Sequence, residues 1–245
     1  MDKLKCKIEK YWNWRSSSYA LDVEKSPETE KAWDTTIKTL AKSGQNQDAL
    51  DIGTGPGQLA FYLAGAGFNV TGLDISPEMI NNARKRAEEM ELSIDFRTGD
   101  AEHLDFPDNS FDVVVSRNLI WTLPNPDLAL KEWHRVLKPG GRIIVSDGFW
   151  QNQTWKRFYQ IPMNLLKSVF QINSRISLRF FLHYASMMKH LPLYEGVKKN
   201  EVQKLLQCAG FNEVSSWDIG QCFGKNPYAF ALSVSPSFFI VYADK

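Results

Sequence analysis

The chain has 245 residues, of which 43% are hydrophobic, 13% aromatic and 23% charged. This composition is typical of one large globular domain and excludes a disordered or collagen-like protein. Lysine and arginine number 29 against 28 aspartate and glutamate residues, so the net charge of +1 supplies no field that would attract nucleic acid.

The first 42 residues are rich in aromatic side chains and predict a helical, aromatic N-terminal cap over 1–42. The N-terminus lacks the apolar segment of an export signal, and no run reaches the roughly 18 apolar residues of a membrane span. Cys6, Cys208 and Cys222 are too widely spaced for a disulfide framework or a metal site. The sequence therefore predicts a cytoplasmic protein without bound metal or a membrane span.

Residues 43–148 show short apolar runs that alternate with helical patterns, which is typical of a parallel sheet covered by helices on both faces. Helices are expected to begin near Gln58, Pro77 and Pro126, and Lys138 to Gly141 are expected to separate the last of them from the next strand. The predicted strands are 49–52, 69–73, 93–97, 111–115 and 142–145.

The rest of the chain departs from this alternation. Residues 149–195 predict a mostly helical insertion with ten aromatic side chains and six basic residues against one acid, Glu195. Residues 196–245 predict a helix capped by Asn200 and ending near Gly210, followed by the last strands of the sheet, although Pro236 interrupts them.

A glycine-rich loop follows the first predicted strand. Gly53, Gly55 and Gly57 allow positive φ angles and let a ligand approach the backbone closely, so we interpret the loop as a ligand cradle. Asp74 ends the next strand, about 20 residues further on, where a carboxylate can bind ribose hydroxyls. The spacing suits a dinucleotide or S-adenosylmethionine.

Three residues favour S-adenosylmethionine. Gln58 stands where the dinucleotide pattern needs a third close-packing glycine, and Pro56 removes an N–H that could bind a pyrophosphate. Asp51 would repel phosphate but could pair with a cationic amino group.

Several motifs in order resemble class I S-adenosylmethionine-dependent methyltransferases, in the small-molecule branch that includes ubiquinone- and menaquinone-biosynthesis-type enzymes. These stretches are LDIGTGPGQLA, GLDIS, GDAEHLDFPDNSFDVVVS, SRNLIWTLPNP and RVLKPGGRIIVSD. The resemblance implies a Rossmann-like, doubly wound α/β fold whose seven-stranded sheet has a last antiparallel strand, with the helical insertion after strand 5. It also implies methyl transfer to a small-molecule acceptor by in-line displacement.

The resemblance assigns the cofactor-binding residues as follows. Asp51 and Gly53 would contact the methionine end, which Asn118 would border, and Asp74 would hold the ribose. Ile75 and Met79 would flank the adenine ring, whose amino group Asp100 would bind beside the amide of Ala101. The full set is Asp51, Gly53, Gly55, Gly57, Asp74, Ile75, Met79, Asp100, Ala101 and Asn118.

Methyl transfer from a sulfonium depends mainly on positioning and exclusion of water, so a base is optional. The candidates for a base are His183, Tyr184, His190 and Asp147. We expect the insertion and the N-terminus to form the acceptor pocket, and the basic charge of the insertion favours an anionic or aromatic acceptor. The residues expected at its mouth are Tyr11, Tyr19, Arg117 and Trp121.

Other functions remain open at this stage. A regulatory or scaffold protein could bind S-adenosylmethionine without turnover, and a nicotinamide oxidoreductase is disfavoured by Gln58 and Pro56. A nucleic-acid adenine methyltransferase would need Asn/Asp-Pro-Pro-aromatic where SRNLIW stands. The cysteine arrangement of arsenite methyltransferases is not matched.

Overall fold

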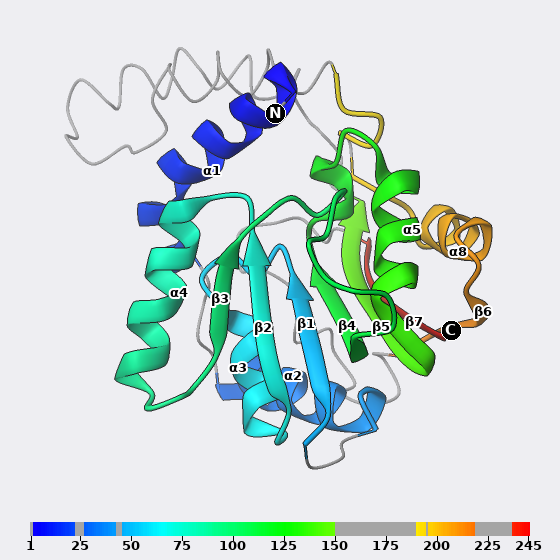
Figure 1. Ribbon diagram of the computed structural model, residues 1–245, viewed down its shortest axis with the longest axis horizontal. Coiled ribbons are helices and arrows are strands. Elements are labelled where there is room, and N and C mark those ends of the chain that lie inside the picture. The colour runs from blue at the N-terminus through cyan, green and yellow to red at the C-terminus, as the bar shows by residue number, and fades with distance from the viewer. Residues whose placement is uncertain (1, 23–26, 43–45, 150–189, 195, 219–236) are drawn as a thin grey trace.

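A computed structural model describes residues 2–22, 27–42, 46–149, 190–194, 196–218 and 237–245. Seven strands form one sheet in the order β3-β2-β1-β4-β5-β7-β6 (Figure 1). The strands are β1 Asp48–Ile52, β2 Asn69–Asp74, β3 Asp95–Thr98, β4 Phe111–Arg117, β5 Leu137–Phe149, β6 Asn212–Ser216 and β7 Ser237–Asp244. The helices are α1 Lys3–Asp22, α2 Pro27–Leu40, α3 Gln58–Gly65, α4 Pro77–Glu89, the 3-10 helix η1 Ile120–Thr122, α5 Pro126–Val136 and α8 Lys199–Cys208.

The direction of the strands confirms the predicted sheet. β1 pairs in parallel with β2 and β4, β2 with β3, and β4 with β5, whereas β7 runs antiparallel to β5 and β6. The strand order reverses between β1 and β4, and open sheets of this kind bind ligands beyond the carboxyl ends of the strands at that point. The doubly wound α/β fold is therefore confirmed, and the fold itself indicates where a ligand would bind.

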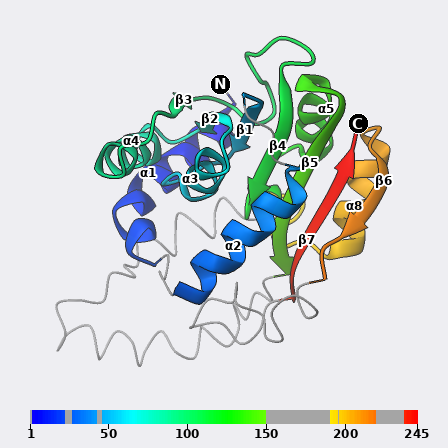
Figure 2. The ribbon, with the colours of Figure 1, turned by 90° about the horizontal axis from the view of Figure 1, so that it is seen from below.

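Helices cover both faces of the sheet. The cluster on one face contains apolar side chains of α5 and α8, including Leu130, Trp133 and Leu206. The cluster on the opposite face contains side chains of α2, α3 and α4, and Figure 2 shows α2 lying across the strands opposite α5 and α8. The central strand β4 supplies Val114 to one cluster and Val113 and Val115 to the other, which explains its nearly continuous apolar sequence.

Three details of the secondary structure differ from the sequence-based expectations. Lys138 to Gly141 do not precede the fifth strand, because β5 already begins at Leu137, which pairs with Phe111 before a shift of register. The helix expected to be capped by Asn200 is instead capped by Lys198 and begins two residues earlier, at Lys199, and the Glu201 carboxylate accepts a hydrogen bond from the Lys198 amide. The polar edge strand β6 was not predicted because Asn212–Ser216 has no apolar run.

The N-terminal segment contributes two helices that are placed differently. α2 buries Trp33, Ile37 and Leu40 against the sheet, whereas Figure 1 shows α1 at the end of the sheet toward which β1 and β2 point.

The division into 1–42, 43–148, 149–195 and 196–245 stays a prediction, and most of the predicted helical insertion lies outside the described residues. No helix in the described ranges has the length and apolar character that crossing a bilayer requires.

Trp133 anchors α5 beneath the loop that follows β3. Its side chain is fully buried, and its indole N–H donates to the Ala101 carbonyl at 2.9 Å. Replacing it with alanine should lower the free energy of unfolding by about 3–5 kcal/mol, because a large cavity forms and the Ala101 carbonyl loses its donor. Leu128→Ala, on the exposed side of the same helix, should cost less than about 1 kcal/mol. Urea unfolding measures both, and equal losses would contradict this assignment.

Candidate functional site

A cavity lies at the carboxyl ends of β1 to β4, where the strand order reverses. Its empty space is about 690 Å³, including the mouth that opens to solvent. The lining residues come from α1, from the carboxyl ends of the strands and from the segments that follow them: Lys5, Ile8, Trp12, Tyr19, Gly53, Gly55, Leu73, Asp74, Ile75, Met79, Gly99, Asp100, Ala101, Glu102, Arg117, Asn118, Leu119, Thr122, Leu123 and Pro124.

Backbone hydrogen bonds, to β2 and within the loop, hold the segment between β1 and α3 in place. Gly53, Gly55 and Gly57 have φ angles of 69°, 53° and 87°, in the left-handed region that favours glycine. The amides of Gly53 and Thr54 both donate to the Leu73 carbonyl, at 2.8 and 2.9 Å, and the Gly57 amide donates to Thr54 O at 2.9 Å. These donors are therefore already used inside the protein.

Asp51 supports this loop from below. Its side chain is 2% exposed, and Oδ2 accepts from Thr54 Oγ1 at 2.6 Å and from the Ala60 amide at 3.0 Å. Burial raises the pKa of Asp51 to about 6, although these hydrogen bonds act in the opposite direction. The carboxylate thus occupies an amide in the first turn of α3, where a phosphate would bind in a dinucleotide site.

Asp74 faces the cavity from the end of β2. Its Oδ2 accepts from the Gly55 amide and its Oδ1 from the Ser76 amide, both at 2.9 Å. Burial raises the pKa of Asp74 to about 6, with the two amide hydrogen bonds opposing the shift. The two amides therefore hold the Asp74 carboxylate in one orientation at the cavity wall, and its remaining lone pairs can accept hydrogen bonds from ligand hydroxyls.

The end of β4 supplies the opposite wall. Arg117 donates from Nη2 to Gln58 Oε1 at 2.5 Å, and its guanidinium lies 5.4 Å from the centre of the Trp33 ring. Asn118 follows with a φ of 54°, and its buried Oδ1 accepts no hydrogen bond from any residue that the structure describes. A buried acceptor without a donor favours a ligand that carries an N–H, O–H or ammonium group.

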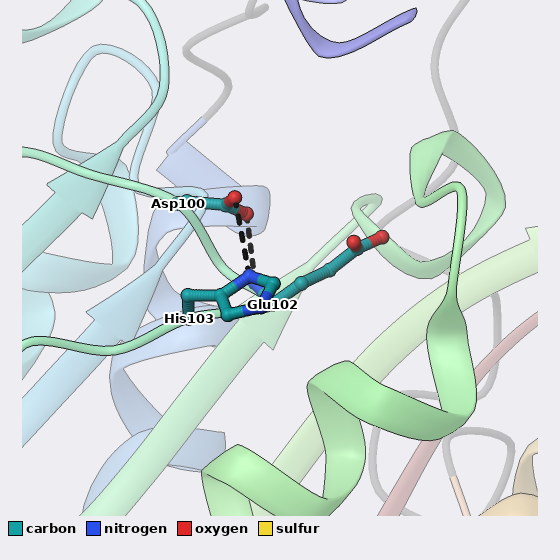
Figure 3. A group of neighbouring side chains, drawn as sticks. All are labelled: Asp100, Glu102 and His103. Atoms are coloured by element: carbon teal, nitrogen blue, oxygen red, sulfur yellow. Dashed lines mark hydrogen bonds and ion pairs between the residues drawn. The ribbon is translucent and has the colours of Figure 1, made fainter. Parts of the chain in front are cut away.

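Three titratable side chains gather where the loop after β3 passes the cavity: Asp100, Glu102 and His103 (Figure 3). Asp100 Oδ2 lies 3.5 Å from His103 Nδ1, whereas the Glu102 carboxylate points away from the imidazole. The Lys5 ammonium lies 2.6 Å from Asp100 Oδ2 and 2.6 Å from Glu102 Oε2. The Lys5 ammonium group therefore lies between the carboxylates of Asp100 and Glu102 and forms an ion pair with each.

The structure places most of the predicted cofactor-binding residues together. Eight of the ten line the cavity: Gly53, Gly55, Asp74, Ile75, Met79, Asp100, Ala101 and Asn118. Asp51 and Gly57 are not among the lining residues and act through the loop, since a Cβ on Gly57 would lie 2.7 Å from Phe61. Direct contact of these ten residues with a cofactor stays a prediction.

The predicted acceptor and base residues are placed less uniformly. Tyr19 and Arg117 line the cavity, whereas Tyr11 packs with Ile8 and Leu191, and Trp121 in η1 is not a lining residue. Asp147 is fully buried in β5, where Oδ1 accepts from the Gly148 amide. His190 is exposed, and His183 and Tyr184 lie outside the described residues.

Sequence reasoning missed three residues of α1 that line the cavity. Lys5, Ile8 and Trp12 lie three and four positions apart and so share one face of the helix, which continues to Tyr19. That spacing was a usable signal, but the lysine and the aromatic residues have no shared apolar character that would mark them as one face.

Residues 50–145 match the family described as a methyltransferase domain. The chain carries a methyltransferase domain. Over 121 residues it is 42% identical to the ubiquinone/menaquinone biosynthesis C-methyltransferase of Rhodopseudomonas palustris, an alignment that covers 46% of this chain and 48% of the relative. The chain thus spans about half the length of this curated relative. The resemblance to S-adenosylmethionine-dependent methyltransferases is confirmed.

Solved structures share the fold of the methyltransferase domain and of the elements around it. An S-adenosylmethionine-dependent methyltransferase from Thermotoga maritima matches with a TM-score of 0.52 at 23% identity, covering 88% of this chain and 89% of the other. The cyclase SpnF matches with a TM-score of 0.58 at 20% identity, covering 86% and 79%. At these identities the likeness shows the fold. The methyltransferase family implies S-adenosylmethionine as the cofactor.

Proposed function

We propose that this protein transfers a methyl group from S-adenosylmethionine to a small-molecule acceptor in the cavity at the carboxyl ends of β1 to β4. The observation that supports this most strongly is the hydrogen bonding of the glycine loop. The amides of Gly53, Thr54, Gly55 and Gly57 all donate within the protein, and Pro56 has no N–H. The loop therefore offers a close backbone surface to a ligand but no donors for a pyrophosphate.

The same geometry disfavours a nicotinamide dinucleotide. Two carboxylates, Asp51 and Asp74, hold the loop, and phosphate oxygens placed there would be repelled by both. A ligand with a positive amino group, a sulfonium and ribose hydroxyls meets neither obstacle. The residues present thus fit S-adenosylmethionine better than a dinucleotide.

Each part of the cofactor has a proposed partner in the cavity. Asp74 would accept from the ribose hydroxyls, and the buried Oδ1 of Asn118 would accept from the amino group of the methionine end. Asp100 uses Oδ1 for the Glu102 amide and Oδ2 for Lys5, which leaves lone pairs for the adenine amino group. Ile75 and Met79 supply apolar surface for the ring.

When bound, S-adenosylmethionine supplies a methyl group on a sulfonium, which any correctly placed nucleophile can attack in line. The protein then has to position the acceptor and exclude water, and α1 contributes Trp12 and Tyr19 to that part of the cavity. With Arg117 on the opposite wall, these rings favour an aromatic or anionic acceptor, and we propose a compound of that class. No base is assigned to a described residue.

Turnover is tested by incubating the purified protein with methyl-labelled S-adenosylmethionine and a panel of small aromatic acceptors, including hydroquinones and phenols. Transfer of label to an acceptor, with formation of S-adenosylhomocysteine, is the expected result. One fold supports many chemistries, as the cyclase among the structural neighbours illustrates. Binding of the cofactor without transfer to the panel or to a cell extract would instead favour a regulatory or scaffold protein.

The two raised pKa values predict how cofactor binding depends on pH. Lowering the pH from 7.5 to 5.0 should weaken S-adenosylmethionine binding at least about tenfold, because only about a tenth of a carboxylate remains ionised one unit below a pKa of about 6. Unfolding does not explain such a loss, since a carboxyl whose pKa is higher in the folded state stabilises that state as the pH falls from 6 toward 4. Calorimetry at both pH values measures the effect, and equal affinities would contradict it.

A further inference from the structure

Lys5 is the one lysine of α1 whose side chain enters the cavity wall. Lys3, Lys7 and Lys10 of the same helix are exposed, whereas Lys5 is 7% exposed. Its Nζ lies 2.6 Å from Asp100 Oδ2 and 2.6 Å from Glu102 Oε2. Burial alone would lower the pKa of Lys5, but its hydrogen bonds and attraction to both carboxylates outweigh this and raise it. The side chain is therefore a fixed positive charge.

The two carboxylates belong to different contacts around the cavity. Asp100 lies in the loop after β3, where the adenine end of the cofactor is expected. Glu102 is fully buried and accepts from the Asn125 amide at 2.6 Å and from Asn125 Nδ2 at 3.1 Å. Because Asn125 precedes α5, Lys5 connects α1 at once to the loop after β3 and to the segment that leads into α5.

Hydrogen bonds also join α1 to α4 and to the residue that caps it. Ser76 Oγ donates to Asn13 Oδ1 at 2.6 Å, and Asn82 Nδ2 donates to the Ser16 carbonyl at 3.3 Å. The apolar cluster under α1 contains three buried residues, Ile8, Tyr11 and Leu191, and is separate from the two large clusters of the sheet. The ion pairs of Lys5 therefore hold α1 on the side of Asp100 and Glu102, in addition to these contacts.

We propose that Lys5 is a positioning residue that fastens α1 against the cofactor cavity through its ion pairs with Asp100 and Glu102, and that it thereby slows release of the cofactor. This proposal rests on the proposed function. It follows from the fact that one face of α1, from Lys5 to Tyr19, is a wall of the same cavity that Asp74 and the glycine loop line. A ligand that contacts this wall as well as the strand ends should leave faster when the wall moves away from it.

The test compares Lys5→Met with Lys7→Met, which removes an exposed charge two positions further along the same helix. Two quantities are measured: hydrogen exchange of the amides of Lys3–Asp22 without ligand, and the dissociation rate of S-adenosylhomocysteine by stopped flow. In Lys5→Met we expect exchange and dissociation both to be at least about tenfold faster, because two carboxylates lose their cation. Lys7→Met should match the parent, and Lys5→Arg should restore much of the slow dissociation.

The outcomes separate this proposal from the proposed function. If the parent binds S-adenosylhomocysteine but Lys5→Met releases it at the parental rate, or if α1 exchanges no faster, the fastening role of Lys5 is wrong. If the parent binds none of it, the proposed function fails first. Should Lys5→Met not fold, Lys5→Met combined with Glu102→Gln removes the stranded buried charge, and the same two measurements on that variant decide.

Discussion

Replacing Asp74 by alanine is expected to weaken S-adenosylmethionine binding at least about 100-fold. The carboxylate lines the cavity, and hydrogen bonds to a charged group contribute about 1.5–3 kcal/mol each, so losing those to two ribose hydroxyls accounts for this factor. The substitution also frees the amides of Gly55 and Ser76, which loosens the loop. Calorimetric titration of the parent and the variant measures the change.

The matched control is Asp105→Ala, which removes an exposed aspartate from the segment after β3. Its affinity should equal that of the parent. Thermal unfolding of Asp74→Ala establishes that the variant is folded at the temperature of the titration. A folded Asp74→Ala that binds within threefold of the parent would show that this carboxylate does not hold the cofactor.

Replacing Gly53 by alanine should have an effect of similar size through sterics. Gly53 has a φ of 69°, and a Cβ there would lie 2.9 Å from both Cδ atoms of Leu119. Since Gly53 and Leu119 both line the cavity, relief of this clash must change the cavity itself. We expect cofactor affinity to fall at least about 100-fold, because the added Cβ and the displaced Leu119 side chain both take up space beside the loop that the ligand would occupy.

Gly67→Ala separates the two causes. Gly67 also has a positive φ, 93°, but a Cβ there meets nothing within 4 Å. This variant should lose about 1–2 kcal/mol of stability from backbone strain and keep the parental affinity. If Gly53→Ala behaved like Gly67→Ala, with a small loss of stability and unchanged binding, the close approach of ligand and loop would be disproved.

The parts of the fold that could be predicted from the sequence are those with local chemical signals. The central strands are short apolar runs because both faces of the sheet are covered, and Ser76 followed by Pro77 predicts the start of α4, where Ser76 Oγ accepts from the Met79 amide. The glycine loop and Asp74 are likewise readable, since positive φ angles and a strand-end carboxylate have few other causes. These signals predict the parallel strands of the sheet, and the resemblance of the motifs to methyltransferases implies its seven strands.

The remaining features depend on contacts between distant segments. The pairing of Lys5 with Asp100 and Glu102 joins residues about a hundred positions apart, and nothing near Lys5 distinguishes it from Lys3 or Lys7. The strand β6 forms at an edge, where β7 supplies its hydrogen-bonding partner and a polar sequence is tolerated. Likewise, that Asp51 acts from beneath the loop and not from the cavity surface follows from its bonds to Thr54 and Ala60.

Calorimetric titration with both kinds of ligand tests the central claim most directly, because the glycine loop is expected to accept an adenosyl sulfonium and to reject a pyrophosphate. The purified protein is titrated at pH 7.5 with S-adenosylmethionine, S-adenosylhomocysteine, NAD⁺ and NADP⁺. Saturable binding of the first two with a Kd below about 100 μM, and no heat from either dinucleotide, is the predicted result. Binding of a dinucleotide in place of S-adenosylmethionine would contradict the account.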